Sequence, residues 1–571
     1  ELLGAGYVIQ KAVREATGWE WAMVAGEGGS GDRVAVTIGV DEAMGRREGY
    51  RLSVSEEGIE IVGSDPAGAF YGAQTLAQLI RQSPKGVGAV RIEDWPDFPA
   101  RGVMLDISRD KVPTMQTLYA LVDELAAMKV NQLQLYTEHT FAYRGHPEVW
   151  AQASPMTGQE ILELDRYCRE RFIELVPNQN SFGHMERWLK HPRYLPLAEA
   201  PDGFDFPWGR HEGPFSLCPT DPGSVALIES LYDELLPHFG SRMFNVGCDE
   251  TFDLGQGRSK AECEKRGKER VYLDFLLKIH KRVKDRGRRM QFWGDIILHR
   301  PELISELPDD LIAMEWGYEA NHPFDQEGEM FHKAGVPYYV CPGTSSWLSI
   351  AGRTENAIGN LKNAAENGLK HGAIGYLNTD WGDLGHLQYL PVSYLGFAAG
   401  AAYSWCWEAN RELPIAEAVS RHVFRDRAGV MGQVAYELGN VYGKLKRQIT
   451  NSTLLFWGLV GGPMRAERKK ELEQITGEEY EAVENAIEAA MGPLERARMD
   501  RGDAALIGDE FRNAAAMLRH ACRRGRMGDR DRLREELSGI IGEHRRLWVA
   551  RNRIGGLAES TRRLEARLDA D

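Results

Sequence analysis

Two adjacent carboxylates, Asp249 and Glu250, are the residues of this chain whose types and spacing best fit acid catalysis. Neighbouring carboxylates repel one another, which tends to keep one of them protonated and able to donate a proton. Cleaving a glycosidic bond requires such a donor at the leaving oxygen. The usual two-carboxylate mechanism places its carboxylates about 5 Å or more apart, on opposite sides of the bond. Adjacent residues do not easily bracket a sugar in this way, but they suit a reaction in which the substrate supplies its own nucleophile.

Asp249 and Glu250 follow one of eight apolar segments in the middle of the chain, and further polar and aromatic side chains follow the other seven. They are Arg109; Glu138 and His139; Asn178, Asn180 and His184; Trp293 and Asp295; Trp316 and Glu319; Trp347; and Asp380, Trp381 and Asp383. Indole rings stack on the C–H faces of sugars, while carboxylates, amides and arginine bind hydroxyls. A phosphate ligand would need several basic residues, and only Arg109 qualifies. The set predicts a neutral, hydroxyl-rich ligand, with a structural ion pair to Asp106 or Asp110 as the alternative role of Arg109.

The two histidines have competing interpretations. His184 could relay protons between Glu138 and Glu250, whereas a single histidine is more often a structural residue. A metal site could combine His139 and His184 with the carboxylates, but no HxH or HExxH spacing occurs. We therefore expect neither a metal nor another cofactor.

The eight apolar segments alternate with helical patterns and predict strands. The expected strands are residues 103–108, 132–137, 173–176, 243–247, 290–293, 311–315, 338–341 and 373–377. Eight strands that are each followed by a helix, over roughly 300 residues, indicate a closed (β/α)8 TIM barrel, whose functional side chains come from the C-terminal strand ends. An open doubly wound sheet usually has a glycine-rich loop after its first strand, where this chain has Ser108-Arg109-Asp110-Lys111. We predict an α/β fold with this barrel at residues 96–410.

Two regions of different pattern flank the predicted barrel. Residues 1–95 contain alternating runs at 33–38 and 58–62 and a helix-like stretch at 67–82, which predicts a small α+β domain. Residues 411–571 have helical spacing throughout, and their arginines are mixed with acidic residues, which favours a solvated surface over an anion-binding face. Packing against the barrel and formation of a homodimer are both compatible with this region.

Composition excludes several classes of protein. The 571 residues carry a formal net charge of −15, with 43% hydrophobic and 27% charged residues, which is typical of a globular chain and argues against a nucleic-acid partner. No apolar run is long enough to span a membrane. The seven cysteines are scattered without CxxC spacing, which favours reduced thiols and a cytoplasmic location. The chain opens at Glu1 without a methionine, which leaves room for a removed leader.

Several separated motifs within about residues 49–407 follow a known pattern. Four of them are GYRL at 49–52, GAFYGAQTL at 68–76, RGVMLDISR at 101–109 and FNVGCDE at 244–250. They resemble glycoside hydrolase family 20, the β-N-acetylhexosaminidases: the first two its small α+β domain, the third its first barrel strand and the last its Asp-Glu signature. That family usually has His at the position of Asn245 and Gly at that of Cys248. The resemblance is therefore to a divergent, bacterial-type branch.

The resemblance implies exo-acting hydrolysis of terminal β-linked GlcNAc or GalNAc with retention. Glu250 would be the general acid and then the general base. Asp249 would hold the N–H of the substrate's acetamido group, whose oxygen attacks the anomeric carbon and forms an oxazolinium ion. Arg109 would bind the hydroxyls of the terminal sugar.

The resemblance also implies roles for the remaining candidates. Trp293 and Trp316 would line the acetamido pocket. Trp381 and Asp383 would correspond to the family's Trp-x-Glu motif. Glu138 and His184 would adjust the pKa of the general acid, Glu250. The family's strand-7 tyrosine, a donor to the acetamido oxygen, has its best candidate in Tyr339. Trp347, at the end of the same strand, is a further expected sugar contact.

Two other functions remain open from the residues. One is a barrel glycosidase with two side-chain carboxylates and no need for the acetamido group, in which Glu319 or Asp383 is the distant partner of Glu250. The other is a carbohydrate-binding protein without catalysis, against which the intact Asp249-Glu250 pair counts.

Overall fold

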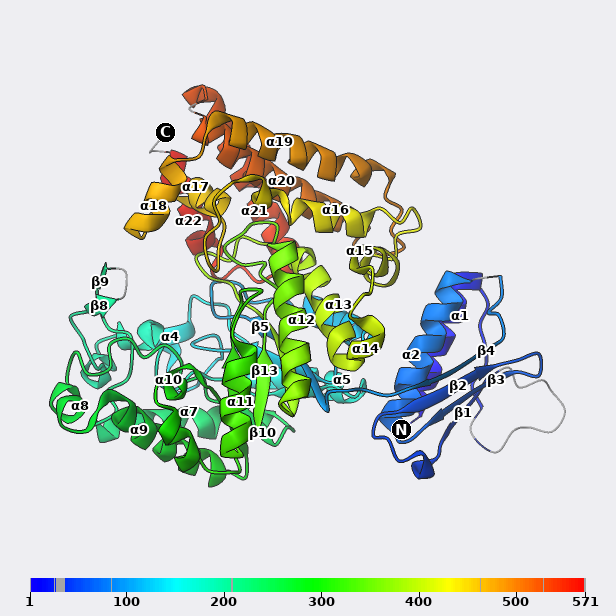
Figure 1. Ribbon diagram of the computed structural model, residues 1–571, viewed down its shortest axis with the longest axis horizontal. Helices are drawn as coiled ribbons and strands as arrows, with labels where there is room; N and C mark the ends of the chain where they lie inside the picture. The colour runs from blue at the N-terminus through cyan, green and yellow to red at the C-terminus, as the bar shows by residue number, and fades with distance from the viewer. Residues whose placement is uncertain are drawn as a thin grey trace.

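The computed structural model describes residues 2–24, 26, 36–83, 85–206, 209–462, 464–526 and 528–568. Along the chain it has a small sheet domain, a barrel and a helical region, which confirms the predicted fold class (Figure 1). Residues 33–35 of the first expected run lie outside the described residues.

The N-terminal domain is a four-stranded sheet covered by two helices. Its elements are α1 (Leu3–Thr17), β1 (Val36–Val40), β2 (Tyr50–Val54), β3 (Ile59–Gly63), α2 (Pro66–Gln82) and β4 (Val90–Asp94). The strand order is β1-β3-β2-β4, and both helices lie on one face (Figure 1). Helix α2 begins at Pro66 because the Asp65 side chain accepts from the Gly68 N–H. A buried ion pair of 2.6 Å between Glu48 and Arg101 joins this domain to the barrel.

Eight parallel strands form the barrel, as predicted. They are β5 (Ala100–Asp106), β6 (Gln132–Tyr136), β7 (Glu174–Val176), β10 (Met243–Asn245), β11 (Arg289–Trp293), β12 (Ile312–Trp316), β13 (Tyr338–Cys341) and β14 (Gly375–Asp380). The sheet runs β10-β11-β12-β13-β14-β5-β6-β7. Asn245 closes it, because its N–H donates to the Pro177 carbonyl and its carbonyl accepts from the Gln179 N–H, each at 2.9 Å. All eight C-terminal ends therefore open on one face.

Helices and one hairpin surround the barrel (Figure 1). They are α3 (Met115–Ala127), α4 (Pro147–Trp150), α5 (Gly158–Arg169), α6 (Glu186–Leu189), β8 (Phe204–Phe206) with β9 (Gly209–His211), α7 (Pro222–Leu235), α8 (Lys260–Arg266), α9 (Lys268–Lys284), α10 (Asp295–Leu298), α11 (Phe324–Ala334), α12 (Thr354–Lys370) and α13 (Leu390–Trp405). Helix α13 is buried on nearly all sides, so its sequence is apolar without the one-sided pattern of a surface helix.

The C-terminal region is helical and packs on the barrel. Its helices are α14 (Trp407–Asn410), α15 (Ile415–Ala418), α16 (Met431–Leu438), α17 (Leu454–Val460), α18 (Ala466–Glu473), α19 (Gly477–Met491), α20 (Ala504–Gly525), α21 (Arg530–Arg551) and α22 (Leu557–Leu568). Arg187 on α6 donates to Glu559 on α22 at 2.8 Å and to Asp110 at 3.1 Å. A Cβ on Gly556, where φ is 78°, would lie 1.7 Å from the Asp110 carbonyl oxygen, so α22 begins directly against the loop after β5.

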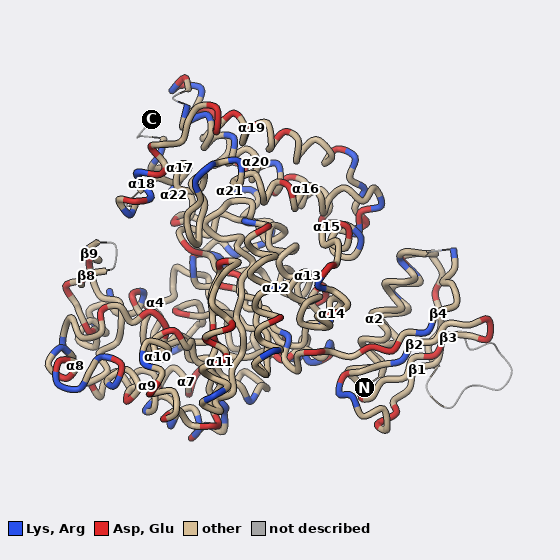
Figure 2. The backbone as a smooth tube through the Cα atoms, viewed as in Figure 1, with Lys and Arg blue, Asp and Glu red and all other residues tan. Residues whose placement is uncertain are grey.

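Charged residues of both signs alternate along the C-terminal helices (Figure 2). Arg523, for example, pairs with Glu484 on α19 at 3.1 Å. All seven cysteines are free thiols, and five of them are buried. None of the described helices combines the length and apolar character that crossing a membrane requires.

Candidate active site

The chain leaves β10 through a kink that carries Asp249 and Glu250. Gly247, Cys248 and Glu250 have positive φ of 69°, 73° and 49°. A Cβ on Gly247 would lie 2.5 Å from the Asn180 side chain, so glycine is required there for space as well as for φ. At Cys248 and Glu250, which are not glycine, the left-handed conformation costs about 1–3 kcal/mol of conformational strain each. It persists only where the surrounding structure imposes it.

Asp249 and Glu250 meet at His184. The His184 Nε2 atom lies 3.3 Å from Asp249 Oδ2 and 3.4 Å from Glu250 Oε2. Asn180 Nδ2 donates to Asp249 Oδ1 at 3.0 Å. The Asp249 side chain is 9% exposed and that of Glu250 is 35% exposed. Glu250 is therefore the carboxylate that a ligand reaches from solvent, whereas Asp249 is held in place.

The charges of this group are unevenly distributed. Burial raises the pKa of Asp249, but His184, the Asn180 hydrogen bond and Arg109 outweigh it and hold the pKa below its ordinary value. Burial lowers the pKa of His184, but Asp249 and Glu250 raise it well above its ordinary value.

Asp295 is a third carboxyl group beside this pair. Its Oδ2 atom accepts from the Glu250 N–H at 3.2 Å. Burial, followed by the charges of Asp249 and Glu250, raises the pKa of Asp295 well above its ordinary value. The carboxylate repulsion expected from the sequence therefore acts on Asp295, whose pKa it raises, while the pKa of Asp249 is lowered.

Arg109 extends this charged group from the end of β5. Its Nη1 atom lies 3.1 Å from Asp106, its Nε atom 3.3 Å from Glu138 and 3.9 Å from Asp383, and its Nη2 atom 3.4 Å from His184 Nδ1. The expected ion pair with Asp106 is therefore present. The same guanidinium also reaches the open face at the C-terminal strand ends, the mouth of the barrel, where the Arg109 side chain is 20% exposed. Burial raises the pKa of Asp383 to about 6, against the effect of Arg109.

Three of the four predicted tryptophans gather around the mouth, together with a tyrosine. Trp293 and Trp381 have ring centroids 5.9 Å apart, and Trp316 stacks on Tyr318 at 5.2 Å. The Trp381 indole N–H donates to the Tyr318 hydroxyl at 2.8 Å. Our sequence reasoning missed Tyr318, although its place two residues after Trp316 indicates the same side of an extended segment.

Tyr136 is a second residue that our sequence reasoning missed. Its hydroxyl donates to Glu138 Oε1 at 2.9 Å and accepts from Asn180 Nδ2 at 3.2 Å. The Arg109 guanidinium lies over its ring, 4.7 Å from the centroid. Tyr136 precedes Glu138 by two residues in an extended segment, so the same spacing could have found it.

Two predicted residues lie elsewhere. The Tyr339 ring fills the space beside Gly375, the first residue of β14. Burial raises the pKa of Tyr339, and three of the side chains that also act on it, Gln132, Glu174 and Arg289, are the first residues of β6, β7 and β11. Tyr339 therefore points to the opposite end of the barrel from the mouth. Trp347 is 1% exposed, donates to Asn451 Oδ1 at 3.1 Å and packs edge-on against Tyr318 at 5.0 Å, so it supports Tyr318 from behind.

Glu319 is already occupied by protein groups. Arg353 donates to its two oxygens at 2.9 and 2.6 Å, and the Asn451 N–H donates to it at 2.7 Å. Although burial opposes the effect, Arg353 and the Asn451 N–H hold the pKa of Glu319 below its ordinary value. This bonding disfavours Glu319 as the distant partner of Glu250.

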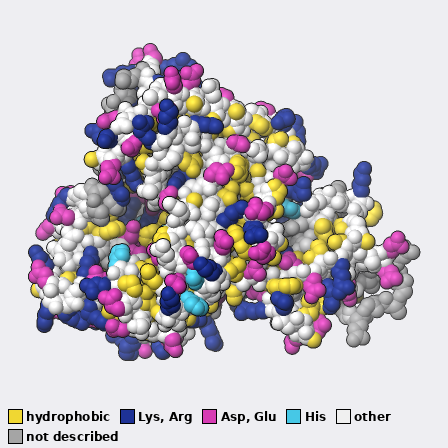
Figure 3. Space-filling model, in the orientation of Figure 1, with side chains coloured by type: hydrophobic (Ala, Val, Ile, Leu, Met, Phe, Trp, Pro, Cys, Tyr) yellow, Lys and Arg dark blue, Asp and Glu magenta, His cyan; other side chains and the backbone are white. Residues whose placement is uncertain are grey.

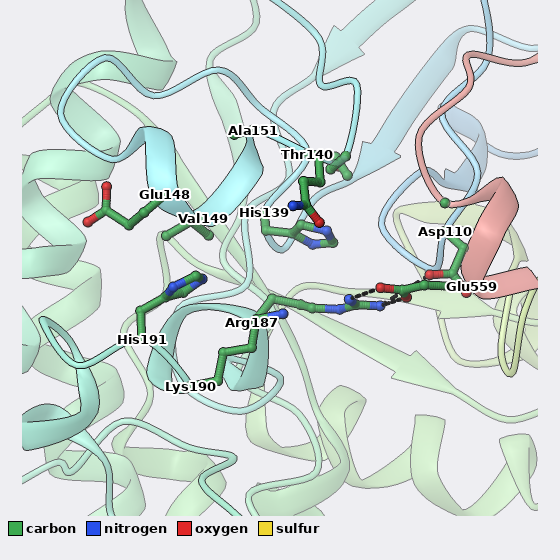
Figure 4. A pocket seen from close by; sticks show the side chains of 13 residues that line it. Asp110, His139, Thr140, Glu148, Val149, Ala151, Arg187, Lys190, His191 and Glu559 are labelled. Atoms are coloured by element: carbon green, nitrogen blue, oxygen red, sulfur yellow. Dashed lines mark hydrogen bonds and ion pairs between the residues drawn. The ribbon is translucent and has the colours of Figure 1, made fainter.

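His139 turns away from His184. It lies in a separate cavity of about 210 Å³ with Glu148, Arg187, His191 and Glu559 (Figure 4). Burial, with Arg187 and Lys190, lowers the pKa of His139 to about 3. The two histidines therefore share no metal site, whereas donor atoms of His184, Asp249 and Glu250 lie within 4.8 Å of one another and could hold a cation.

A recess opens between the β8–β9 hairpin and the C-terminal helices, with acidic side chains in view (Figure 3). A parallel barrel whose mouth joins paired carboxylates, an arginine and tryptophans has the architecture of a barrel glycoside hydrolase. The chain matches the family model of glycosyl hydrolase family 20, catalytic domain, over residues 98–369, and domain 2 of the same family over residues 4–95. These matches cover more than half of the chain, which belongs to glycosyl hydrolase family 20.

Individual relatives agree with this family. The beta-hexosaminidase of Porphyromonas gingivalis is 27% identical over 307 residues, which are 48% of this chain and 38% of the relative. That of Vibrio vulnificus is 33% identical over 386 residues, 56% of this chain and 45% of the relative. The chain thus spans less than half of these relatives' length. The chitobiase of Flavobacterium johnsoniae shares the fold, with a TM-score of 0.58 at 16% identity over 99% of this chain and 94% of that one.

Replacing Gly247 by Ala tests whether the kink sets the position of Asp249. The new Cβ meets Asn180 at 2.5 Å, so we expect the rate of the reaction that this site catalyses to fall by about tenfold or more, because small displacements in an active site are costly. Gly287→Ala is the matched control, since Gly287 has the same φ of 69° with nothing within 4 Å. Equal activity in the two variants would show that the contact with Asn180 is unimportant.

Proposed function

We propose that this chain is an exo-acting β-N-acetylhexosaminidase that removes terminal β-linked GlcNAc or GalNAc with retention. The observation that carries the proposal is the placement of Asp249 and Glu250 on one kink, with both carboxylates against the same His184 nitrogen. Donor oxygens of the two residues lie within 4.8 Å of each other. Two groups on the same side cannot act from opposite faces of a bond, so the second nucleophile is best supplied by the substrate.

The first step breaks the glycosidic C–O bond. Glu250 donates its proton to the leaving oxygen while the acetamido oxygen forms a bond to the anomeric carbon. Asp249 accepts a hydrogen bond from the acetamido N–H, and its negative charge offsets the positive charge that develops on the oxazolinium ion. His184 and Asn180 keep Asp249 charged and oriented for this role.

The second step returns the sugar to its original configuration. Water attacks the anomeric carbon and gives a proton to Glu250, and the acetamido oxygen leaves as the ring of the intermediate opens. Two inversions at one carbon produce net retention. Glu250 is thereby restored to its protonated form for the next cycle.

Tyr318, and not Tyr339, is the side chain suited to donate to the acetamido oxygen. Its hydroxyl accepts from the Trp381 N–H, which leaves its own proton to donate. Burial, with a smaller effect of Asp249, raises the pKa of Tyr318 well above its ordinary value, so the hydroxyl stays protonated. The Trp316 and Trp381 rings hold it at the mouth, and the Thr379 hydroxyl is its other neighbour.

The panel of substrates that tests the proposal is 4-nitrophenyl β-GlcNAc, β-GalNAc, β-glucoside and β-galactoside. We expect cleavage of the two acetamido sugars only, since the plain sugars lack the internal nucleophile. Cleavage of the plain sugars would instead favour two side-chain carboxylates, with Asp383 as the partner of Glu250. Binding of all four without turnover would indicate a carbohydrate-binding protein.

Substitution of each carboxylate separates its role. Glu250→Gln should lower kcat by about 10²–10⁴-fold with an unactivated leaving group, and less with 4-nitrophenol, which barely needs protonation. Asp249→Asn should slow both substrates, because it impairs the internal nucleophile. Unchanged kcat of Asp249→Asn on the activated substrate would refute substrate assistance.

Tyr318→Phe removes the proposed donor and keeps the ring. We expect kcat on 4-nitrophenyl β-GlcNAc to fall on the order of 10²-fold, as when one oxyanion donor is removed. Tyr339→Phe is the control, because its hydroxyl lies at the other end of the barrel. Loss of kcat in Tyr339→Phe with retention in Tyr318→Phe would reverse the assignment.

A further inference from the structure

A second cluster of ionisable side chains lies where β12 passes into α11. Glu315 is near the end of β12, His322 is in the following loop, and Glu327 is on the first turn of α11. The His322 Nε2 atom lies 2.9 Å from Glu315 Oε1 and 3.1 Å from Glu327 Oε2. Donor atoms of the three residues lie within 4.8 Å of one another; among the residues that the structure describes, only the group around His184 is comparable.

Glu315 gives this cluster an unsatisfied ligand atom. Its side chain is 0% exposed, and its Oε2 atom is buried without a hydrogen-bond partner in the described part of the chain. A buried carboxylate oxygen without a partner is costly, and an unrecorded ion is one of its standard explanations. This atom is an observation independent of the hydrogen bonds that hold the cluster together.

Charge in the cluster is also unbalanced. His322 is the one ion-pair partner that either glutamate has among the described residues. With both carboxyl groups ionised against one imidazolium, the cluster carries a net negative charge in a largely buried place, which is unfavourable. Burial, together with Glu327, accordingly raises the pKa of Glu315 well above its ordinary value, so a proton on Glu315 is one way to balance the charge. A divalent cation with a neutral imidazole is another, and it would bring the net charge of the cluster to zero.

The donor set selects a class of metal. One imidazole nitrogen and two carboxylate oxygens suit divalent first-row ions such as Zn²⁺ or Mn²⁺, whereas Ca²⁺ takes six to eight oxygens. Zinc ligands at about 2.1 Å stand about 3.4 Å apart in a tetrahedral site. His322 Nε2 lies 2.9 and 3.1 Å from the two carboxylate oxygens, so these atoms would move apart by a few tenths of an ångström when the ion binds. His322 and Glu327 are 18% and 23% exposed, which leaves a side open for water as a further ligand.

The His322 ring is held in position before any ligand binds. A Cβ on Gly317 would lie 2.1 Å from its Nδ1 atom, so the ring packs on bare backbone. Asn363 Nδ2 donates to the His322 carbonyl at 2.8 Å, and the Phe324 ring meets the imidazole edge-on at 4.6 Å. Such support restricts the histidine to one orientation, which favours metal affinity.

We propose that Glu315, His322 and Glu327 bind one divalent transition-metal ion, best matched by Zn²⁺, and that this ion fixes the loop carrying Tyr318 and Glu319. Tyr318 and Glu319 lie between Glu315 and His322 along the chain, and Arg353 pairs with Glu319 at 2.6 Å. The ion is structural and takes no part in bond breaking. Its effect on hydrolysis rests on the proposed function, whereas its binding does not.

Calorimetric titration of the chelator-treated full chain with Zn²⁺ and with Mn²⁺ tests the site. We expect one equivalent of ion and a higher Tm for the unmodified protein. Glu327→Gln should weaken this binding by about 100-fold or more, because even the loss of a group that only supports a ligand costs up to about 100-fold. Glu329→Gln is the matched control: it is on the same helix, 50% exposed and paired with Lys333 at 2.9 Å, and should bind as the unmodified protein does.

Other outcomes overturn the proposal. Absence of binding to the unmodified protein would mean that protons alone hold the cluster, in line with the two glutamates, which outweigh burial and raise the pKa of His322 to about 9. Binding that survives Glu327→Gln and is lost in His184→Asn would place the ion in the active site instead. His322→Asn gives a second test of ligation if Glu327→Gln fails to fold.

Activity measurements keep the two proposals distinct. If the ion binds at this site but no acetamido sugar is hydrolysed, the proposed function would be refuted and the metal site would not. If the titration shows that the ion binds here, but its removal leaves the rate of hydrolysis unchanged, the proposed coupling between the ion and the Tyr318 loop would be refuted.

Discussion

The active site depends on a compact group of opposite charges across the C-terminal strand ends. Glu138, Asp249 and Glu250 lie 3.3 to 3.4 Å from two cations, Arg109 and His184. The two cations are themselves 3.4 Å apart, so Arg109 opposes the positive charge on His184 that Asp249 and Glu250 favour. Burying any of these groups alone would carry a large desolvation cost, which the carboxylates on either side of the cations offset. The arrangement therefore holds the side chains in one orientation and leaves Glu250, the most exposed of them, open to solvent.

This network requires backbone that regular strands do not provide. After β10, Gly247, Cys248 and Glu250 have positive φ, and His184 has a φ of 53°. The strain is maintained by close approach of the two loops: a Cβ on Gly183 would lie 2.4 Å from the Asp249 carbonyl oxygen. Cys248, where the family pattern has glycine, occupies one of these strained positions, so this chain keeps the kink without the residue that forms it most easily.

The outer parts of the molecule also determine the mouth. Helix α22 is tied to the loop after β5 through Arg187, Glu559 and Asp110. The segment before α17 brings Asn451 to both Trp347 and Glu319. These contacts give the C-terminal helices a role that helical periodicity alone did not indicate: they hold the loops that carry Arg109 and Tyr318.

Sequence alone determined the barrel and its reactive core. Eight alternating segments imply parallel strands, and parallel strands must present Arg109, His184, Asp249 and Glu250 at one face. What the tertiary structure decided is which way the other candidates point. Tyr339 faces the far end of the barrel, His139 a neighbouring cavity, and Glu319 an arginine distant in sequence, while Tyr318 takes the place at the mouth. The reason is that position along a strand follows from local periodicity, whereas side-chain direction and charge compensation depend on loops and helices that only folding brings together.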